Sequence, residues 1–243
     1  MKVAICFWGL TRSLKHTLPS INKHIFNVLK QHNIEFDCFL HTYNLPCISN
    51  KRSNELNVKL DTEEYKRLPL SNFLITSQEE FDSTCDFTKF SKCGDPWGDG
   101  GNSIKNFIRA LNSLNLVSSL WIEHSHLYDV VLYIRPDLLY GNNINIQQLQ
   151  TASQNPSYIF TPSWHKFDGL NDRLAFGHPD AMKHYGQRFQ YAEAFASTRK
   201  IYSEHFLAYI VKKCSLKNID TSLVGKRMRA TGKIHTTDKG LFK

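Results

Sequence analysis

The chain of 243 residues contains no long apolar run. Its uninterrupted apolar stretches all fall well short of the ~20 residues that cross a bilayer, so no membrane-spanning helix is predicted. The apolar segment Val3–Trp8 is too short for a secretory signal, and Arg12 and Lys15 follow it closely. We therefore expect a soluble protein that begins at Met1 and resides in a cytosol-like, cytoplasmic compartment.

Several short motifs with well-defined chemistry are also missing. Without a G-x-G-x-x-G or Walker A sequence, a nicotinamide-dinucleotide site or a P-loop is disfavoured. Without G-x-S-x-G, a Ser-His-Asp hydrolase is not supported, and without H-E-x-x-H a zinc protease of that class is excluded. The six cysteines form neither a C-x-x-C pair nor a zinc-ligand rhythm, so we expect free thiols.

Basic residues outnumber acidic ones, which gives a formal net charge of +8. A basic protein can favour nucleic acid, acidic membrane surfaces or phosphorylated small molecules as binding partners. The densest basic cluster is Lys226–Arg229 with Lys233. However, basic and aromatic residues do not form the interleaved stripe typical of proteins that bind single-stranded nucleic acid. A non-catalytic nucleic-acid or polyanion-binding module that uses this cluster is therefore the alternative interpretation rather than the leading one.

The order of apolar segments predicts one α/β domain. Lys2–Trp8 and Glu35–Thr42 are typical of buried strands, and a helix is expected between them across Pro19–Gln31. This order indicates a parallel sheet with right-handed crossovers. Asn102–His126 is the clearest amphipathic helix, and the nearly continuous apolar run Tyr128–Ile134 suits the centre of a parallel sheet. The expected fold is a Rossmann-like, mostly parallel central sheet flanked by helices.

Two polar segments interrupt this pattern. Leu45–Arg67 is expected to be a variable loop with a short helix near Thr62–Arg67, and Phe81–Gly101 a loop that folds over a site. The other expected elements are strands at Asn72–Thr76, Ser157–Thr161, Arg173–Gly177 and Ser222–Val224, and helices at Pro179–Ser197 and Tyr202–Lys213. The length suits a single domain over residues 1–243.

A polar turn, Gly9–Ser13, follows the first strand. In an open α/β sheet, ligands bind beyond the carboxyl ends of the strands. The glycine lets a phosphate or a base approach the backbone, the Thr11 hydroxyl and the helix start offer donors, and Arg12 can pair with phosphate. Contact with a ligand is favoured here over an ordinary turn. Arg109, in the long helix, can reach the same cleft or lie on a solvated face.

The strand Tyr128–Ile134 ends in Arg135-Pro136-Asp137, where charges emerge at the carboxyl edge of the sheet. Asp137 can hold a divalent cation that neutralises a diphosphate, and Arg135 can contact phosphate or orient Asp137. A structural ion pair between these two residues, closing a loop, remains open.

Further polar candidates lie in the second half of the chain. Asp172, in the turn Asn171–Arg173, can act as a general base on a hydroxyl or pair with Arg173. Glu204 lies in the first turn of a late helix, a position that favours a carboxylate whatever its function. His235 lies in the basic tail, where a surface or capping role is the simpler interpretation.

Together these segments resemble nucleotide-sugar glycosyltransferases of the GT-A fold, in particular small ones of large DNA viruses and bacteria. The resemblance rests on the order of segments that span most of the chain: KVAICFWGLTRS, FDCFLHTY, SIKNFIRALNSL, YDVVLYIRPDLLY, GLNDRLAFGHPDAM and SEHFLAYIV. It implies transfer of a hexose or pentose from a UDP- or GDP-sugar to a hydroxyl of a glycan or glycoprotein. Residues 1–140 would bind the nucleotide-sugar, and residues 141–243 the acceptor.

The resemblance also implies roles for individual residues. Asp137 matches the last position of the family's Asp-x-Asp metal motif, whereas Arg135 occupies the first. Either Asp137 and His235 bind Mn²⁺ or Mg²⁺, or the enzyme is metal-free and Arg135 helps to neutralise the phosphates. The expected base is Asp172, with Glu204 as the second choice. The expected nucleotide-sugar contacts are Gly9, Leu10, Thr11, Arg12, Arg109, Arg135 and Asp137, and the expected acceptor contacts are Asn171 and Arg173.

Overall fold

Seven strands form one central sheet. The computed structural model describes residues 1–242 and orders these strands β10-β8-β9-β6-β1-β2-β5. Six of them run in one direction, and β9 runs antiparallel to its neighbours β6 and β8. The strands are β1 (Lys2–Trp8), β2 (Glu35–Asn44), β5 (Asn72–Ser77), β6 (Val130–Ile134), β8 (Tyr158–Pro162), β9 (Leu174–Gly177) and β10 (Lys217–Thr221). The predicted α/β class with a mostly parallel sheet is confirmed.

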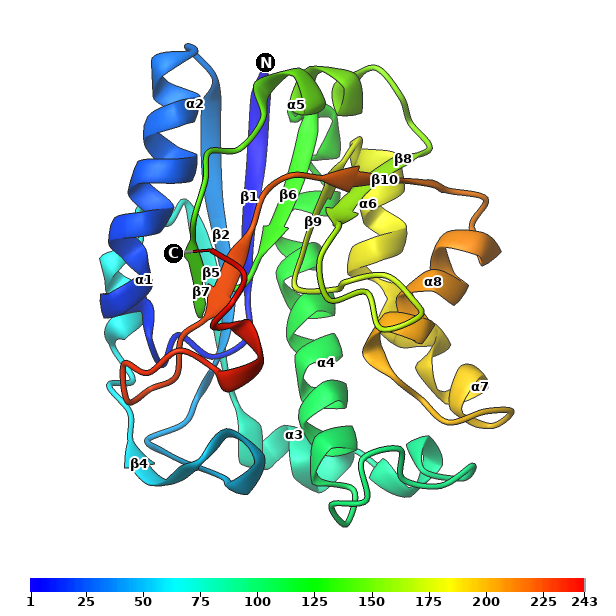
Figure 1. Ribbon diagram of the computed structural model, residues 1–243. Coiled ribbons are helices and arrows are strands. Elements are labelled where there is room, and N and C mark those ends of the chain that lie inside the picture. Colours follow the sequence, from blue (N-terminus) through cyan, green and yellow to red (C-terminus); the bar gives the residue numbers. More distant parts are fainter. Residues whose placement is uncertain (243) are drawn as a thin grey trace.

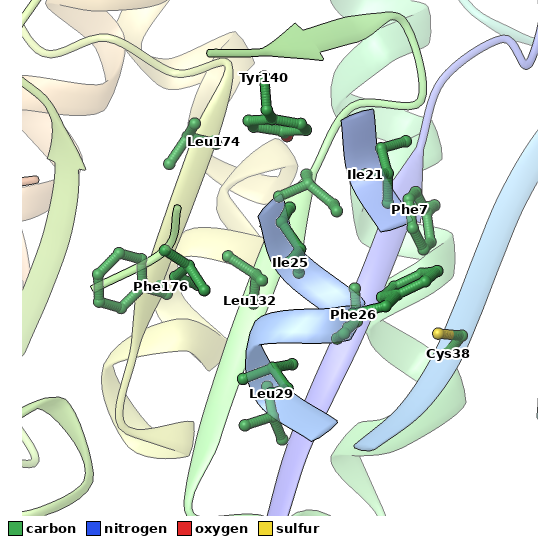
Figure 2. Close-up of a cluster of buried hydrophobic side chains, with 14 of the residues drawn as sticks. Phe7, Ile21, Ile25, Phe26, Leu29, Cys38, Leu132, Tyr140, Leu174 and Phe176 are labelled. Atoms are coloured by element: carbon green, nitrogen blue, oxygen red, sulfur yellow. The ribbon is translucent and has the colours of Figure 1, made fainter. Parts of the chain in front are cut away.

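Helices cover both faces of the sheet (Figure 1). They are α1 (Leu14–Ile21), α2 (Asn27–Gln31), α3 (Gln78–Thr84), α4 (Asn102–Ile122), α5 (Ile146–Ser153), α6 (Pro179–Gly186), α7 (Ala192–Ala196) and α8 (Ser203–Lys213). Because successive side chains of a strand point to opposite faces, Phe7 packs toward α1 and α2, whereas Trp8 packs toward α4. Figure 2 shows the first of these cores, with Ile25 and Leu29 close to Leu132 of β6. Within residues 1–242, no helix combines the length and apolar character needed to span a bilayer.

The first helix begins earlier than predicted. Instead of covering Pro19–Gln31, the helical segment begins at Leu14 and continues through α1, a π-helical turn at Asn22–Phe26 and α2. Pro19 lies inside α1, where its missing N–H removes one bond to the preceding turn. Burial of Leu14 and Ile21 against the sheet outweighs this cost.

The segment Leu45–Arg67 is not the loop that was predicted. Strands β3 (Cys47–Asn50) and β4 (Glu55–Lys59) pair as an antiparallel hairpin, and a 3₁₀ turn at Glu64–Arg67 matches the predicted short helix. The hairpin is polar, so it lacks the apolar alternation by which strands are recognised. The other predicted loop, Phe81–Gly101, begins within α3 and also contains a 3₁₀ turn before it becomes irregular.

The carboxyl-terminal segment crosses the residues that follow β6. The strand predicted at Ser222–Val224 lies later in the chain, where β11 (Gly225–Arg227) pairs antiparallel with β7 (Leu138–Tyr140). The Met228 N–H then donates to the carbonyl oxygen of Asp137 over 2.8 Å. We call residues 225–238 the tail strap. It forms one wall over the carboxyl edge of the sheet.

Candidate active site

A cleft of about 610 Å³ opens at the carboxyl ends of β1, β2 and β6, the edge at which open α/β sheets bind ligands. The β3–β4 hairpin, the first turns of α4, the start of α8 and the tail strap form its walls. Ten of the twelve residues singled out from the sequence line it: Gly9, Leu10, Arg12, Arg109, Arg135, Asp137, Asp172, Arg173, Glu204 and His235. The sheet edge therefore brings together residues that are far apart in the chain.

The other two candidates, Thr11 and Asn171, shape turns beside the cleft. Thr11 is nearly buried, and its carbonyl oxygen accepts the Leu14 N–H over 3.0 Å at the start of α1. Asn171 is buried as well. Its amide nitrogen donates to the Trp164 carbonyl oxygen over 2.7 Å, and its Oδ1 accepts the Arg173 N–H over 3.0 Å.

Gly9 provides the open backbone at the end of β1. Its φ of +91° lies in the left-handed region that favours glycine. Its N–H donates to Ser113 Oγ over 2.8 Å, and within residues 1–242 no atom lies within 4 Å of where a Cβ would stand. A ligand can therefore approach the main chain at this turn.

Asp137 is the centre of a buried cationic cluster. It accepts two parallel hydrogen bonds from Arg135, Nε to Oδ1 over 2.8 Å and Nη2 to Oδ2 over 2.7 Å, and one from Arg12 Nη2 over 3.3 Å. Burial alone would raise the pKa of Asp137, but Arg135 and Arg12 outweigh it and hold that pKa well below its usual range. Arg135 also lies over the Trp8 ring, 5.5 Å from its centre, and Arg12 donates to the buried Glu55 over 3.2 Å. The ion pair between Arg135 and Asp137 left open by the sequence is present.

The donors around Asp137 do not fit a divalent cation held by the protein. Both carboxylate oxygens already accept guanidinium hydrogens. His235 Nδ1 lies 3.0 Å from Arg227 Nη2 and 2.8 Å from Thr237 Oγ1, and burial together with Arg227 lowers the pKa of His235 to about 4. Within residues 1–242, no three His, Cys, Asp or Glu side chains gather as metal ligands. The expected Mn²⁺ or Mg²⁺ with Asp137 and His235 as ligands therefore stays a prediction.

Two carboxylates face the cleft at its other end, because the antiparallel strand β9 begins where β6 ends. Leu174 pairs with Ile134, so the turn that contains Asp172 lies at the same sheet edge as Arg135. Glu204 lies in the first turn of α8, and its carbonyl oxygen accepts the N–H of Leu170, in the loop between β8 and β9, over 3.0 Å. Burial, together with the charge of Asp172, raises the pKa of Glu204. This pair can accept a proton within the cleft.

The sequence analysis missed Arg229 as a cleft residue. It lines the cleft and is only 9% exposed, yet its side chain makes no hydrogen bond within residues 1–242, and its Nε is buried. Burial and the nearby Arg12 lower the pKa of Arg229 to about 10. In the sequence, Arg229 is marked only by its place in the basic cluster Lys226–Arg229. Lys226 and Arg229 are buried and Arg227 pairs with Asp238, so this part of the tail strap faces inward rather than forming an exposed basic patch.

The hairpin side of the cleft combines arginines with aromatic rings. Arg52 lies over the Trp97 ring, 5.6 Å from its centre. Arg109 reaches the cleft as expected, but its Nε and Nη2 donate to Asp82 over 2.8 and 2.6 Å. Arg109 is therefore held in place by an ion pair, with Tyr43 close by through a hydrogen bond to the Arg109 carbonyl oxygen.

No protein-family model matches the chain, and no curated protein sequence matches it. Among solved structures, one similar to it is described as the galactosyltransferase LgtC in complex with donor and acceptor sugar analogs. The two share 10% identity with a TM-score of 0.46, over 90% of this chain and 73% of the other. Another is mouse xyloside xylosyltransferase 1 in its apo form, with 12% identity and a TM-score of 0.43 over 91% and 85% of the two chains. Both similarities are too distant to assign a function, so the function is inferred from the residues of the cleft.

Proposed function

We propose that this protein is a glycosyltransferase of the GT-A-like type that moves a hexose or pentose from a UDP- or GDP-sugar to a hydroxyl of a glycan or glycoprotein. The observation that carries this proposal is the pairing of two chemistries in one cleft. Arginines surround Asp137 at the end of β6, and the carboxylates Asp172 and Glu204 stand at the start of β9 and α8. The arginines can stabilise the negative charge of a departing diphosphate. The carboxylates can take the proton of an acceptor hydroxyl.

The donor diphosphate would lie against Arg12, Arg135 and Arg229. Asp137 fixes the first two by hydrogen bonds, so their guanidinium groups are already oriented before a ligand binds. Within residues 1–242, the Nε groups of Arg229 and Arg12 are buried without a hydrogen-bond partner. The nucleoside would then extend along Gly9 and Leu10 toward Tyr43 and Arg109.

The proposed reaction is a direct displacement. The Asp172 carboxylate, or Glu204 in its place, takes the proton of the acceptor hydroxyl, and the oxygen forms a bond to the anomeric carbon. The bond from that carbon to the diphosphate oxygen breaks, and its electron pair leaves with the nucleoside diphosphate. The arginines stabilise this developing charge in the transition state. One displacement inverts the anomeric configuration.

A divalent cation is a separate part of the proposal. Mn²⁺ or Mg²⁺ would supply further neutralisation of the diphosphate, but Asp137 and His235 would have to give up their contacts with arginines to bind it. The guanidinium groups on Asp137 make activity without added metal the expected result. Activity assays in EDTA and in added manganese measure this directly, and a strict requirement for metal would contradict the metal-free reading.

Incubation of the protein with a panel of UDP- and GDP-sugars tests the proposed reaction through released nucleoside diphosphate. At least one donor should release UDP or GDP, and release should rise when hydroxyl acceptors are added. The double variant Asp172→Asn, Glu204→Gln should lose this turnover while it still binds the nucleotide. Turnover that survives the double variant would remove these carboxylates from the reaction.

A further inference from the structure

Arg173 is a buried cation without an ionic partner. It is 6% exposed and lines the cleft. Within residues 1–242 its guanidinium makes no ion pair, and its one hydrogen bond joins Nη1 to His165 Nδ1 over 3.0 Å. It lies over the Trp164 ring, 5.1 Å from the ring centre, so its plane is supported from one side. Its Nε and Nη2 groups are left for a ligand in the cleft.

The position of Arg173 separates it from the arginines around Asp137. It follows Asp172 directly and is held by His165 and the Trp164 ring. Arg12 and Arg135, in contrast, are hydrogen-bonded to Asp137. Arg173 therefore belongs to the end of the cleft that holds the proposed base, where the acceptor hydroxyl must lie.

Within residues 1–242, the ion pairs around the cleft do not include Arg173. Seven arginines and three carboxylates line the cleft. Three of these arginines have acids of their own outside the lining, since Arg12, Arg109 and Arg227 pair with Glu55, Asp82 and Asp238. A diphosphate would lie against Arg12, Arg135 and Arg229. A buried charge that keeps no partner is costly, so a second anion at Arg173 is the arrangement that completes the site.

We propose that Arg173 binds an oxyanion carried by the acceptor, so that the acceptor is a sugar with a phosphate, sulfate or carboxylate near the reacting hydroxyl. This inference rests on the proposed function, because it takes Asp172 and Glu204 as the end of the cleft that receives the acceptor. A guanidinium with two free donors in one plane matches two oxygens of such a group. Stacking on Trp164 holds that plane in place before the acceptor arrives.

Binding by the unmodified protein tests the proposal first. Methyl hexosides, the same hexosides carrying a 6-phosphate, and the corresponding uronic acids are titrated into protein saturated with UDP or GDP. Saturation occupies the diphosphate cluster, so that a sugar phosphate cannot report on it. At least one anionic series should bind about 10- to 100-fold more tightly than its neutral counterpart, the loss expected for a charge-assisted hydrogen bond. Comparison of the phosphate and carboxylate arms identifies the source of the oxyanion.

Variants then locate the effect. Arg173→Gln should remove the preference for anionic acceptors and leave the Kd for UDP or GDP within about 2-fold, whereas Arg173→Lys should retain part of the preference because it keeps the charge without the planar donors. Arg67→Gln, an exposed arginine outside the cleft lining, is the control with the same loss of charge. Thermal unfolding of each variant confirms that it folds.

Three results would overturn the proposal. One is an equal affinity of the unmodified protein for neutral and anionic hexosides. Another is a loss of nucleotide affinity in Arg173→Gln as large as that in Arg229→Gln, because Arg173 would then belong to the diphosphate cluster. A third is a changed preference between UDP-glucose and UDP-glucuronate with no change toward acceptors, which would put the oxyanion on the donor sugar. A failure of the proposed function looks different, because neither UDP nor GDP would then bind.

Discussion

At the scale of single residues, Asp137 decides how two arginines are presented to the cleft. It is 2% exposed and bonded to Arg135 and Arg12. Removal of its charge would leave these cations without their shared partner, which is the case in which a buried ion pair matters most for stability. The carboxylate is therefore at least as important for the fold of the cleft as for any ligand.

We expect Asp137→Asn to lower the free energy of unfolding by about 3 kcal/mol, at the low end for a broken buried pair because Arg135 retains some exposure. Urea unfolding at neutral pH measures the change. A variant as stable as the parent protein would show that Asp137 serves ligand binding alone.

Arg229 should behave in the opposite way. Its guanidinium has no hydrogen-bond partner within residues 1–242, so Arg229→Gln should leave stability unchanged or raise it slightly. Affinity for UDP or GDP should fall about 10- to 100-fold, as expected for a lost charge-assisted hydrogen bond. Calorimetric titration and thermal unfolding are compared with those of Arg67→Gln. Unchanged nucleotide affinity would exclude Arg229 from the diphosphate site.

At the scale of elements, the tail strap and the loop between β8 and β9 shape the cleft. Asp238 is fully buried and accepts hydrogen bonds from the backbone N–H, Nε and Nη2 of Arg227. Burial would raise its pKa, but Arg227 outweighs it, and the pKa of Asp238 is well below its usual range. Both residues belong to the tail strap, so this ion pair holds its first strand and its last turn together.

This pairing predicts an acid dependence of stability. Because the pKa of Asp238 is lowered in the folded state, its contribution is fully present above the unfolded value of ~3.9 and is lost as the pH falls below it. Asp238→Asn should be less stable than the parent near neutral pH, and the gap between the two should narrow below pH ~4. Urea unfolding at a series of pH values measures both. A constant gap across that window would contradict this account.

The loop between β8 and β9 packs against the start of α8 and offers a test of how Glu204 is positioned. A Cβ on Gly169 would lie 2.3 Å from the carbonyl carbon and oxygen of Glu204, so Gly169→Ala must displace the start of α8. We expect turnover to fall about 100-fold, as small misplacements of catalytic groups do, with nucleotide affinity retained. Gly240→Ala, where the added Cβ meets no atom within 4 Å in the described chain, is the matched control. Equal turnover in the two variants would show that Glu204 needs no such placement.

At the scale of the whole molecule, the sheet and its ligand-binding edge could be predicted from the sequence. β1, β6 and α4 have clear apolar patterns because each is buried against a neighbouring layer. The same patterns locate the turns at Gly9, Arg135 and Asp172, since polar residues follow buried strands at one edge. The placement of most of the candidate residues follows from that topology alone.

The β3–β4 hairpin and the tail strap could not be predicted in the same way. Both are polar and are held by contacts between distant parts of the chain. Glu55 accepts the N–H of Ala230 across 175 residues, and Arg12 meets Asp137 across 125. No local periodicity records such pairings, so Arg229 was seen only as part of a basic cluster.

The central claim is that the arginines around Asp137 bind a nucleoside diphosphate. Isothermal titration of the full chain with UDP and GDP, in EDTA and then in manganese, tests it most directly. We predict that one of the two nucleotides binds in EDTA, that Arg12→Gln and Arg229→Gln weaken it, and that Arg67→Gln does not. A folded protein that binds neither nucleotide under either condition would contradict the account.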